Sequence, residues 1–141
     1  MKFQIEDLNP GTWFDIPGDS DKARICLRVC NFQKLQEIRS ATVKETREVV
    51  FHPGTHVAQK LVTEYRDQAL WDRLYIDYII VDWDGFKDSK TGDPIPCSIE
   101  TKMKLWNGSV SFASFVNKCL GTLNELAVQQ EEDERKNLQT T

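Results

Sequence analysis

Two cysteines and two histidines are spaced like the ligands of a zinc finger. Cys26 and Cys30 are separated by three residues, as are His52 and His56. Apolar and polar residues alternate around the cysteines, which predicts a strand, and four strand steps would separate their α-carbons by roughly 13 Å. Zinc holds thiolates about 2.3 Å away. We therefore expect no metal and no cofactor, and a zinc-dependent nucleic-acid binder is the weakest alternative.

Four aspartates, Asp82, Asp84, Asp88 and Asp93, lie close together and could suggest calcium binding. An EF-hand loop needs glycine at its sixth position. Counted from Asp82 that position is Lys87, and counted from Asp88 it is Asp93. Aspartate near glycine is typical of turns, so we interpret the cluster as a solvated turn.

The sequence lacks the common motifs of enzymes. It contains no G-x-S-x-G elbow, no P-loop and no GxGxxG, and its two histidines fall in one short segment. We therefore expect no enzymatic activity and no catalytic residue.

Length and charge narrow the class of protein. The chain has 141 residues and a net charge of −4, which fits one domain and argues against a nucleic-acid partner. No apolar run approaches the roughly 20 residues that cross a bilayer, and the acidic N-terminus does not resemble a signal peptide. We expect a cytosolic protein without a membrane partner, whose cysteines are free thiols: Cys26, Cys30, Cys97 and Cys119.

Residues 1–54 have the pattern of a strand-rich unit. Strands are predicted at Thr12–Ile16, Lys22–Cys30 and Thr46–Phe51. Asn31 is a candidate cap for a short helix between the second and third strands, with one apolar face made by Phe32, Leu35 and Ile38.

Residues 57–130 have a mainly helical pattern. Apolar residues near a period of 3.6 predict a helix from Val57 to Asp82, and Ser98 is a candidate cap for a helix over Ile99–Trp106. A last helix is expected from Ser109 or Ser111 to about Gln130, followed by a charged flexible tail over 131–141. The predicted fold class is α+β, in a single domain over 1–130 with the strand-rich unit first and the helical part second.

Between the helices, Ile79–Ser98 is expected to form a rigid structural corner. Gly85 can adopt the left-handed conformation that ends a helix. Prolines restrict the backbone of the residues before them, so Asp93 and Ile95 should be extended. The corner residues are Trp83, Gly85, Phe86, Pro94, Ile95 and Pro96.

The last helix carries a wide apolar stripe that includes Phe112, Phe115, Val116 and Leu123. Such a stripe is either ordinary core or a face offered to an amphipathic partner. The pattern alone leaves both interpretations open.

The corner and the helices after it resemble the tail assembly chaperones of long-tailed siphophages and related prophages. The resemblance covers about residues 76–120. It is carried by Ile80–Phe86, Asp88, Gly92, Pro94–Ser98, Lys102–Leu105, Phe112 and Phe115.

The resemblance implies a non-enzymatic protein of the host cytoplasm that is absent from the mature virion. It would bind and solubilise the helical tape measure protein and help tail tube protein assemble around it. A programmed ribosomal frameshift often gives these chaperones a longer form that recruits the tube protein. Here Arg135-Lys136-Asn137 can be encoded as AGA AAA AAC, which contains a slippery heptamer.

On this hypothesis, Phe112, Phe115, Val116 and Leu123 form the partner-binding surface, and the corner holds that surface in place. The alternative is a structural head-tail, tail completion or adaptor protein that stays in the phage particle. Self-association is left open.

Overall fold

The computed structural model describes residues 9–54 and 56–139, without the side chains of residues 130, 131, 134 and 137–139. The chain divides into two compact units. One comprises the described parts of Met1–Cys30 and Ile76–Thr141, and the other is Asn31–Tyr75.

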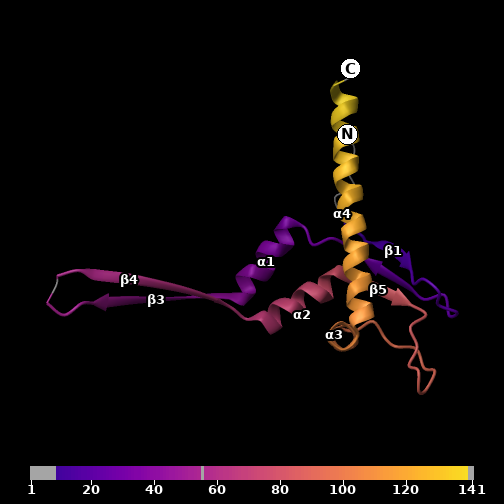
Figure 1. Cartoon of the computed structure of the whole chain (residues 1–141), viewed down its shortest axis with the longest axis horizontal. Helices are drawn as coiled ribbons and strands as arrows, with labels where there is room; N and C mark the ends of the chain where they lie inside the picture. The colour runs from indigo at the N-terminus through magenta and orange to yellow at the C-terminus, as the bar shows by residue number, and fades with distance from the viewer. Residues whose placement is uncertain (1–8, 55, 140–141) are drawn as a thin grey trace. The chain divides into compact units, whose positions relative to one another are not determined.

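The first unit contains an antiparallel sheet of strands β1 (Thr12–Asp15), β2 (Arg24–Leu27) and β5 (Ile80–Asp84), in the order β1-β2-β5 (Figure 1). Ile25 and Leu27 of β2 are buried and Arg24 is exposed, as the alternation in the sequence predicts, but Cys26 on the other face is buried as well. Ile80 and Trp83 of β5 are buried as well. This sheet supports the corner that follows β5.

Two helices complete the first unit. Helix α3 (Ile99–Gly108) begins at Ser98, whose hydroxyl accepts a hydrogen bond from the Thr101 amide in a capping box, as the sequence predicted. Helix α4 (Val110–Gln139) contacts both α3 and β2. Its Val116, Cys119 and Leu120 are buried and add to the core.

The second unit is built around a β-hairpin. Helix α1 (Phe32–Thr42) starts at its predicted cap, where the Asn31 side chain accepts a hydrogen bond from the Lys34 amide at 2.8 Å. Strands β3 (Val43–Phe51) and β4 (Ala58–Arg66) then pair antiparallel over their whole length. Helix α2 (Gln68–Ile79) begins in this unit and ends in the first.

The fold class is confirmed: strands β1 to β5 occupy the chain up to residue 84, and helices α3 and α4 follow. The expected helix from Val57 to Asp82 is wrong, because that segment forms β4, α2 and the start of β5. Val57, Leu61 and Tyr65 recur every four residues, a spacing that keeps one face in a strand as well as in a helix.

Other boundaries also need correction. Gly85 follows a strand, so the corner joins a strand to a helix and not two helices. The backbone of α4 continues to Gln139, well beyond the expected end near Gln130. Of the three apolar residues predicted on one face of α1, Ile38 is buried while Phe32 is 76% exposed.

Candidate functional site

The corner is closed by contacts of Trp83 and Phe86. The Trp83 indole N–H donates a hydrogen bond to the Ile95 carbonyl at 2.8 Å, and the Ile95 amide donates to the Phe86 carbonyl at 2.8 Å. The two aromatic rings stack with their centroids 4.8 Å apart. These contacts fix the chain before the loop against the chain after it.

Gly85 lies where the corner comes closest to the sheet. Its φ is +79°, and a Cβ at this position would lie 3.0 Å from the Ala23 Cα. Both the conformation and the close approach require glycine.

The loop itself is held by aspartates, as turn residues would be. The Asp88 carboxylate accepts a hydrogen bond from the Lys90 amide at 2.8 Å, and the Gly92 amide donates to the Asp88 carbonyl at 2.8 Å. The Asp82 carboxylate accepts a hydrogen bond from the Trp83 amide at 2.8 Å. These two carboxylates serve the local backbone.

Phe112 connects the start of α4 to the corner. Its ring packs edge-on against Trp83 and Phe86, with centroid distances of 6.5 Å and 6.3 Å. Edge-to-face packing is a preferred arrangement of aromatic rings. The three rings form one cluster contributed by β5, the corner and α4.

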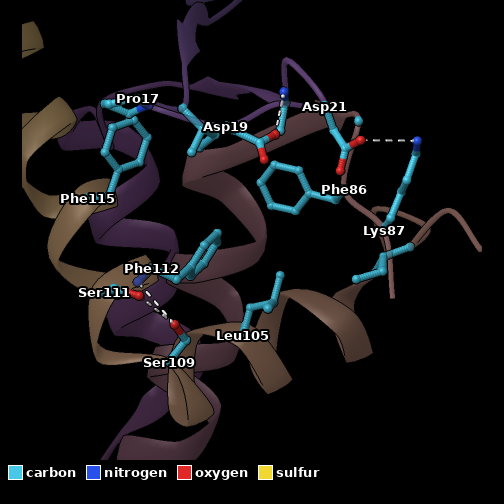
Figure 2. A pocket seen from close by; sticks show the side chains of 14 residues that line it. Pro17, Asp19, Asp21, Phe86, Lys87, Leu105, Ser109, Ser111, Phe112 and Phe115 are labelled. Carbon is cyan, nitrogen blue, oxygen red and sulfur yellow. Dashed lines mark hydrogen bonds and ion pairs between the residues drawn. The ribbon is translucent and has the colours of Figure 1, made fainter. Parts of the chain in front are cut away.

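Beside this cluster lies a groove of about 560 Å³, which we call the corner groove (Figure 2). Phe86, Phe112 and Phe115 point toward it, so its lining is rich in aromatic carbon. The lining residues are Ile16, Pro17, Asp19, Asp21, Ala23, Gly85, Phe86, Lys87, Ile95, Leu105, Ser109, Ser111, Phe112 and Phe115.

Charged side chains of the groove come from the β1–β2 turn and the corner. Asp21 forms an ion pair with Lys87 at 3.5 Å, and both side chains are about half exposed (Figure 2). The Asp19 carboxylate accepts a hydrogen bond from the Ala23 amide at 2.9 Å. The groove therefore combines apolar carbon with two carboxylates and one ammonium.

The structure separates the four residues proposed as a partner-binding surface. Phe112 and Phe115 are half-buried and line the corner groove. Val116 is fully buried and has no surface to offer a partner, because its side chain is part of the core. Leu123 is half-buried and lies two helical turns beyond Phe115, outside the groove.

The corner residues also differ in whether they line the groove. Gly85, Phe86 and Ile95 line the groove, whereas Trp83 is buried and supports the groove from within the aromatic cluster. Pro94 and Pro96 are exposed and are not part of the lining. Pro94 instead forms a β-bridge with Lys87, which holds the base of the loop.

Sequence reasoning missed the wall contributed by the β1–β2 turn. Pro17, Asp19 and Asp21 fall between two predicted strands, where residues of these types indicate only a turn. Their position beside residues 85–115 depends on the pairing of β2 with β5, which local pattern does not report.

Three of the cysteine thiols are not activated as nucleophiles. None of the four cysteines forms a disulfide. Burial raises the pKa of the Cys26, Cys97 and Cys119 thiols above the ordinary value. At Cys97, Asp82 and Asp77 raise the pKa further, while Lys102 and a backbone hydrogen bond oppose the effect of burial. These three thiols hold their protons at neutral pH and are poor nucleophiles.

Residues 9–54 and 56–139 hold no group of three or more histidine, cysteine or acidic side chains arranged to bind a metal ion. Among the helices described, none combines the length and the apolar character needed to cross a membrane.

Comparison of the chain with protein-family models, with curated proteins and with solved structures found no match.

Proposed function

We propose that this protein is a phage tail assembly chaperone that binds and solubilises the tape measure protein. The corner groove is its binding site on this proposal. The observation that supports it most is that six residues that carry the resemblance to these chaperones also line the groove: Gly85, Phe86, Ile95, Leu105, Phe112 and Phe115.

The chemistry of the groove suits an amphipathic helix. Helices bind grooves through apolar side chains spaced three and four residues apart. Covering the half-buried rings of Phe112 and Phe115 would gain about 25 cal/mol for each Å² of apolar surface removed from water. The carboxylates of Asp19 and Asp21 would favour a client segment in which basic residues flank the apolar face.

The acidic balance of the chain suits a solubilising role. A net charge of −4 on each copy would keep a coated client from associating with other coated clients. A long client would bind many copies, so individually weak contacts would add up through avidity.

Recruitment of the tail tube protein belongs to the same proposal. A frameshift at Arg135-Lys136-Asn137 would give the chain an extension that binds the tube protein in the host cytoplasm. The codons of these residues test this directly, because the heptamer A AAA AAC requires an arginine codon that ends in A, followed by AAA and AAC.

Co-expression with the tape measure protein of the same phage tests the chaperone function. We expect the client to be insoluble when expressed alone and soluble, with this chain bound, when both are made. A client that stays insoluble while this chain is soluble and folded would contradict the proposal.

Mass spectrometry of purified virions separates the chaperone from the alternative of a head-tail, tail completion or adaptor protein. A chaperone should be absent from mature particles. Its presence as a stoichiometric component would favour the structural alternative.

A further inference from the structure

The β3–β4 hairpin is a sheet of only two strands in the described part of the chain, so each strand has one edge without a strand partner (Figure 1). Two-stranded ribbons are marginally stable in water, and an open edge can pair with another strand. All nine residues of β4 are exposed. The exposed set includes Leu61, Val62 and Tyr65, at 42%, 57% and 53%.

We propose that β4 pairs antiparallel with β4 of a second copy of this chain. A two-fold axis would then relate the copies, and the hairpins would join in a four-stranded sheet of order β3-β4-β4-β3. This inference is independent of the proposed chaperone function.

The charges of β4 fit this pairing. When Ala58–Arg66 pairs with itself over its full length, Val62 lies at the two-fold axis and Lys60 lies opposite Glu64 of the second copy. Symmetry produces this opposite-charge pair twice, and no like charges face each other. Shifting one strand by one or two residues in either direction removes the pair and creates no other.

Full-length self-pairing of β3 lacks this complementarity, because Val43–Phe51 would centre on Arg47 and set that guanidinium against its own copy. Like charges directly opposite each other destabilise a sheet. A shift of two residues would place Lys44 opposite Glu48 and Glu45 opposite Arg47, but it would pair seven residues instead of nine. The β4 edge therefore combines opposite charges with full-length pairing, which the β3 edge does not.

The hairpin also contains a like-charge pair whose electrostatic repulsion a second copy would reduce. Glu45 and Glu64 lie directly opposite each other in the register of β3 and β4. Each has one neighbouring cation, Arg47 at 3.5 Å for Glu45 and Arg39 at 3.8 Å for Glu64. These pairs are exposed and therefore weak, so Lys60 of a second copy would add a useful third cation beside the two carboxylates.

Charge reversal in the full-length protein tests the pairing. In sedimentation velocity we expect the wild-type chain to form dimers. Lys60→Glu or Glu64→Lys alone should weaken dimerisation by at least about tenfold, because two attractive pairs become two repulsive ones. The double variant K60E/E64K restores opposite charges and should restore the dimer.

Glu64→Lys also separates loss of pairing from loss of folding. Within its own hairpin this variant places a lysine opposite Glu45 and removes the like-charge pair. It also replaces the weak, exposed ion pair with Arg39 by a like-charge contact. At a concentration where the wild-type chain is monomeric, its unfolding temperature should therefore stay close to that of the wild-type chain, while its dimers are lost.

A matched pair of cysteine variants locates the axis. Val62→Cys should form an intermolecular disulfide on oxidation, because directly opposite Cβ atoms in a sheet are about 4.5–5.5 Å apart. Val49→Cys is the control: it lies on β3 with almost the same exposure, 56% against 57%, and should not exceed the background of the wild-type cysteines. A monomeric wild-type chain, a dimer insensitive to both single charge reversals, or preferential cross-linking of Val49→Cys would each overturn the proposal.

Discussion

At the scale of single residues, two glycines of the corner have the same backbone conformation but different surroundings. Gly85 and Gly92 have φ values of +79° and +74°. A Cβ on Gly85 would meet the backbone of Ala23, whereas a Cβ on Gly92 would meet nothing within 4 Å. Alanine substitutions at the two positions therefore separate the free-energy cost of the left-handed conformation from the cost of the close approach.

Gly92→Ala should therefore lower the free energy of unfolding by about 1–2 kcal/mol, the cost of a left-handed conformation for an L-residue. Gly85→Ala should cost more, because the backbone of Ala23 must also move. Denaturant titration of both variants measures the difference. Equal losses would show that the close approach of the corner to the sheet does not matter.

The buried thiols predict a dependence of stability on pH. Since burial raises their pKa, the folded state holds the thiol proton more tightly than the unfolded state does. The resulting stabilisation is fully present below the unfolded pKa of about 8.5 and is lost as pH rises through the folded pKa.

Comparison of the wild-type chain with Cys119→Ala isolates this effect, because every other titrating group is shared. The stability advantage of the wild-type chain should be constant around neutral pH and should shrink above about pH 8.5. A difference that stays constant up to about pH 10 would contradict the assignment.

At the scale of helices and strands, Lys102 of α3 holds the end of α2. Its ammonium, on a side chain only 7% exposed, donates to the Asp77 carbonyl at 3.2 Å and to the Asp77 carboxylate at 3.1 Å. The last carbonyls of a helix lack partners within the helix, and a cation there also opposes the helix dipole. The contact with the carbonyl should therefore matter more than the ion pair, whose carboxylate is half exposed.

Lys102→Met should lower the free energy of unfolding by about 1–3 kcal/mol, because it leaves a helix-end carbonyl without its donor. Asp77→Asn keeps that carbonyl and should cost less than about 1 kcal/mol, since the Asp77 side chain is 54% exposed. Thermal unfolding of the two variants compares the contributions. A larger loss for Asp77→Asn would make the ion pair the important contact.

Elements with an unambiguous local signal could be predicted from the sequence. The Ser98 cap is present, and the strand expected at Lys22–Cys30 forms over Arg24–Leu27. The error over Val57–Arg66 arose because a spacing of four residues fits a strand and a helix equally. The aromatic residues of the corner groove, Phe86, Phe112 and Phe115, could be identified from the sequence as members of the corner and of the apolar stripe. The wall from the β1–β2 turn could not, because its position depends on long-range strand pairing.

At the scale of the whole molecule, each of the two units offers a different surface. The first unit carries the corner groove, which we propose as the site for a client helix. The second unit carries the open β4 edge, which we propose as the contact with a second copy. Two copies joined by their hairpins would bring two grooves to one client, and avidity would strengthen weak binding at each groove.

The most direct test of the chaperone proposal obstructs the groove without touching the core. Ser111 and Asn117 are both exposed residues of α4, but only Ser111 lines the groove. Ser111→Arg would put a long charged side chain into the groove, and Asn117→Arg adds the same side chain to the same helix elsewhere. Because both variants add one positive charge, a difference between them reports the site and not the net charge.

The decisive measurement is the amount of soluble tape measure protein recovered with each variant on co-expression. We predict that Asn117→Arg recovers as much client as the wild-type chain, while Ser111→Arg recovers several-fold less although it folds and unfolds like the wild type. Equal recovery with Ser111→Arg and Asn117→Arg would contradict the assignment of the corner groove as the client site.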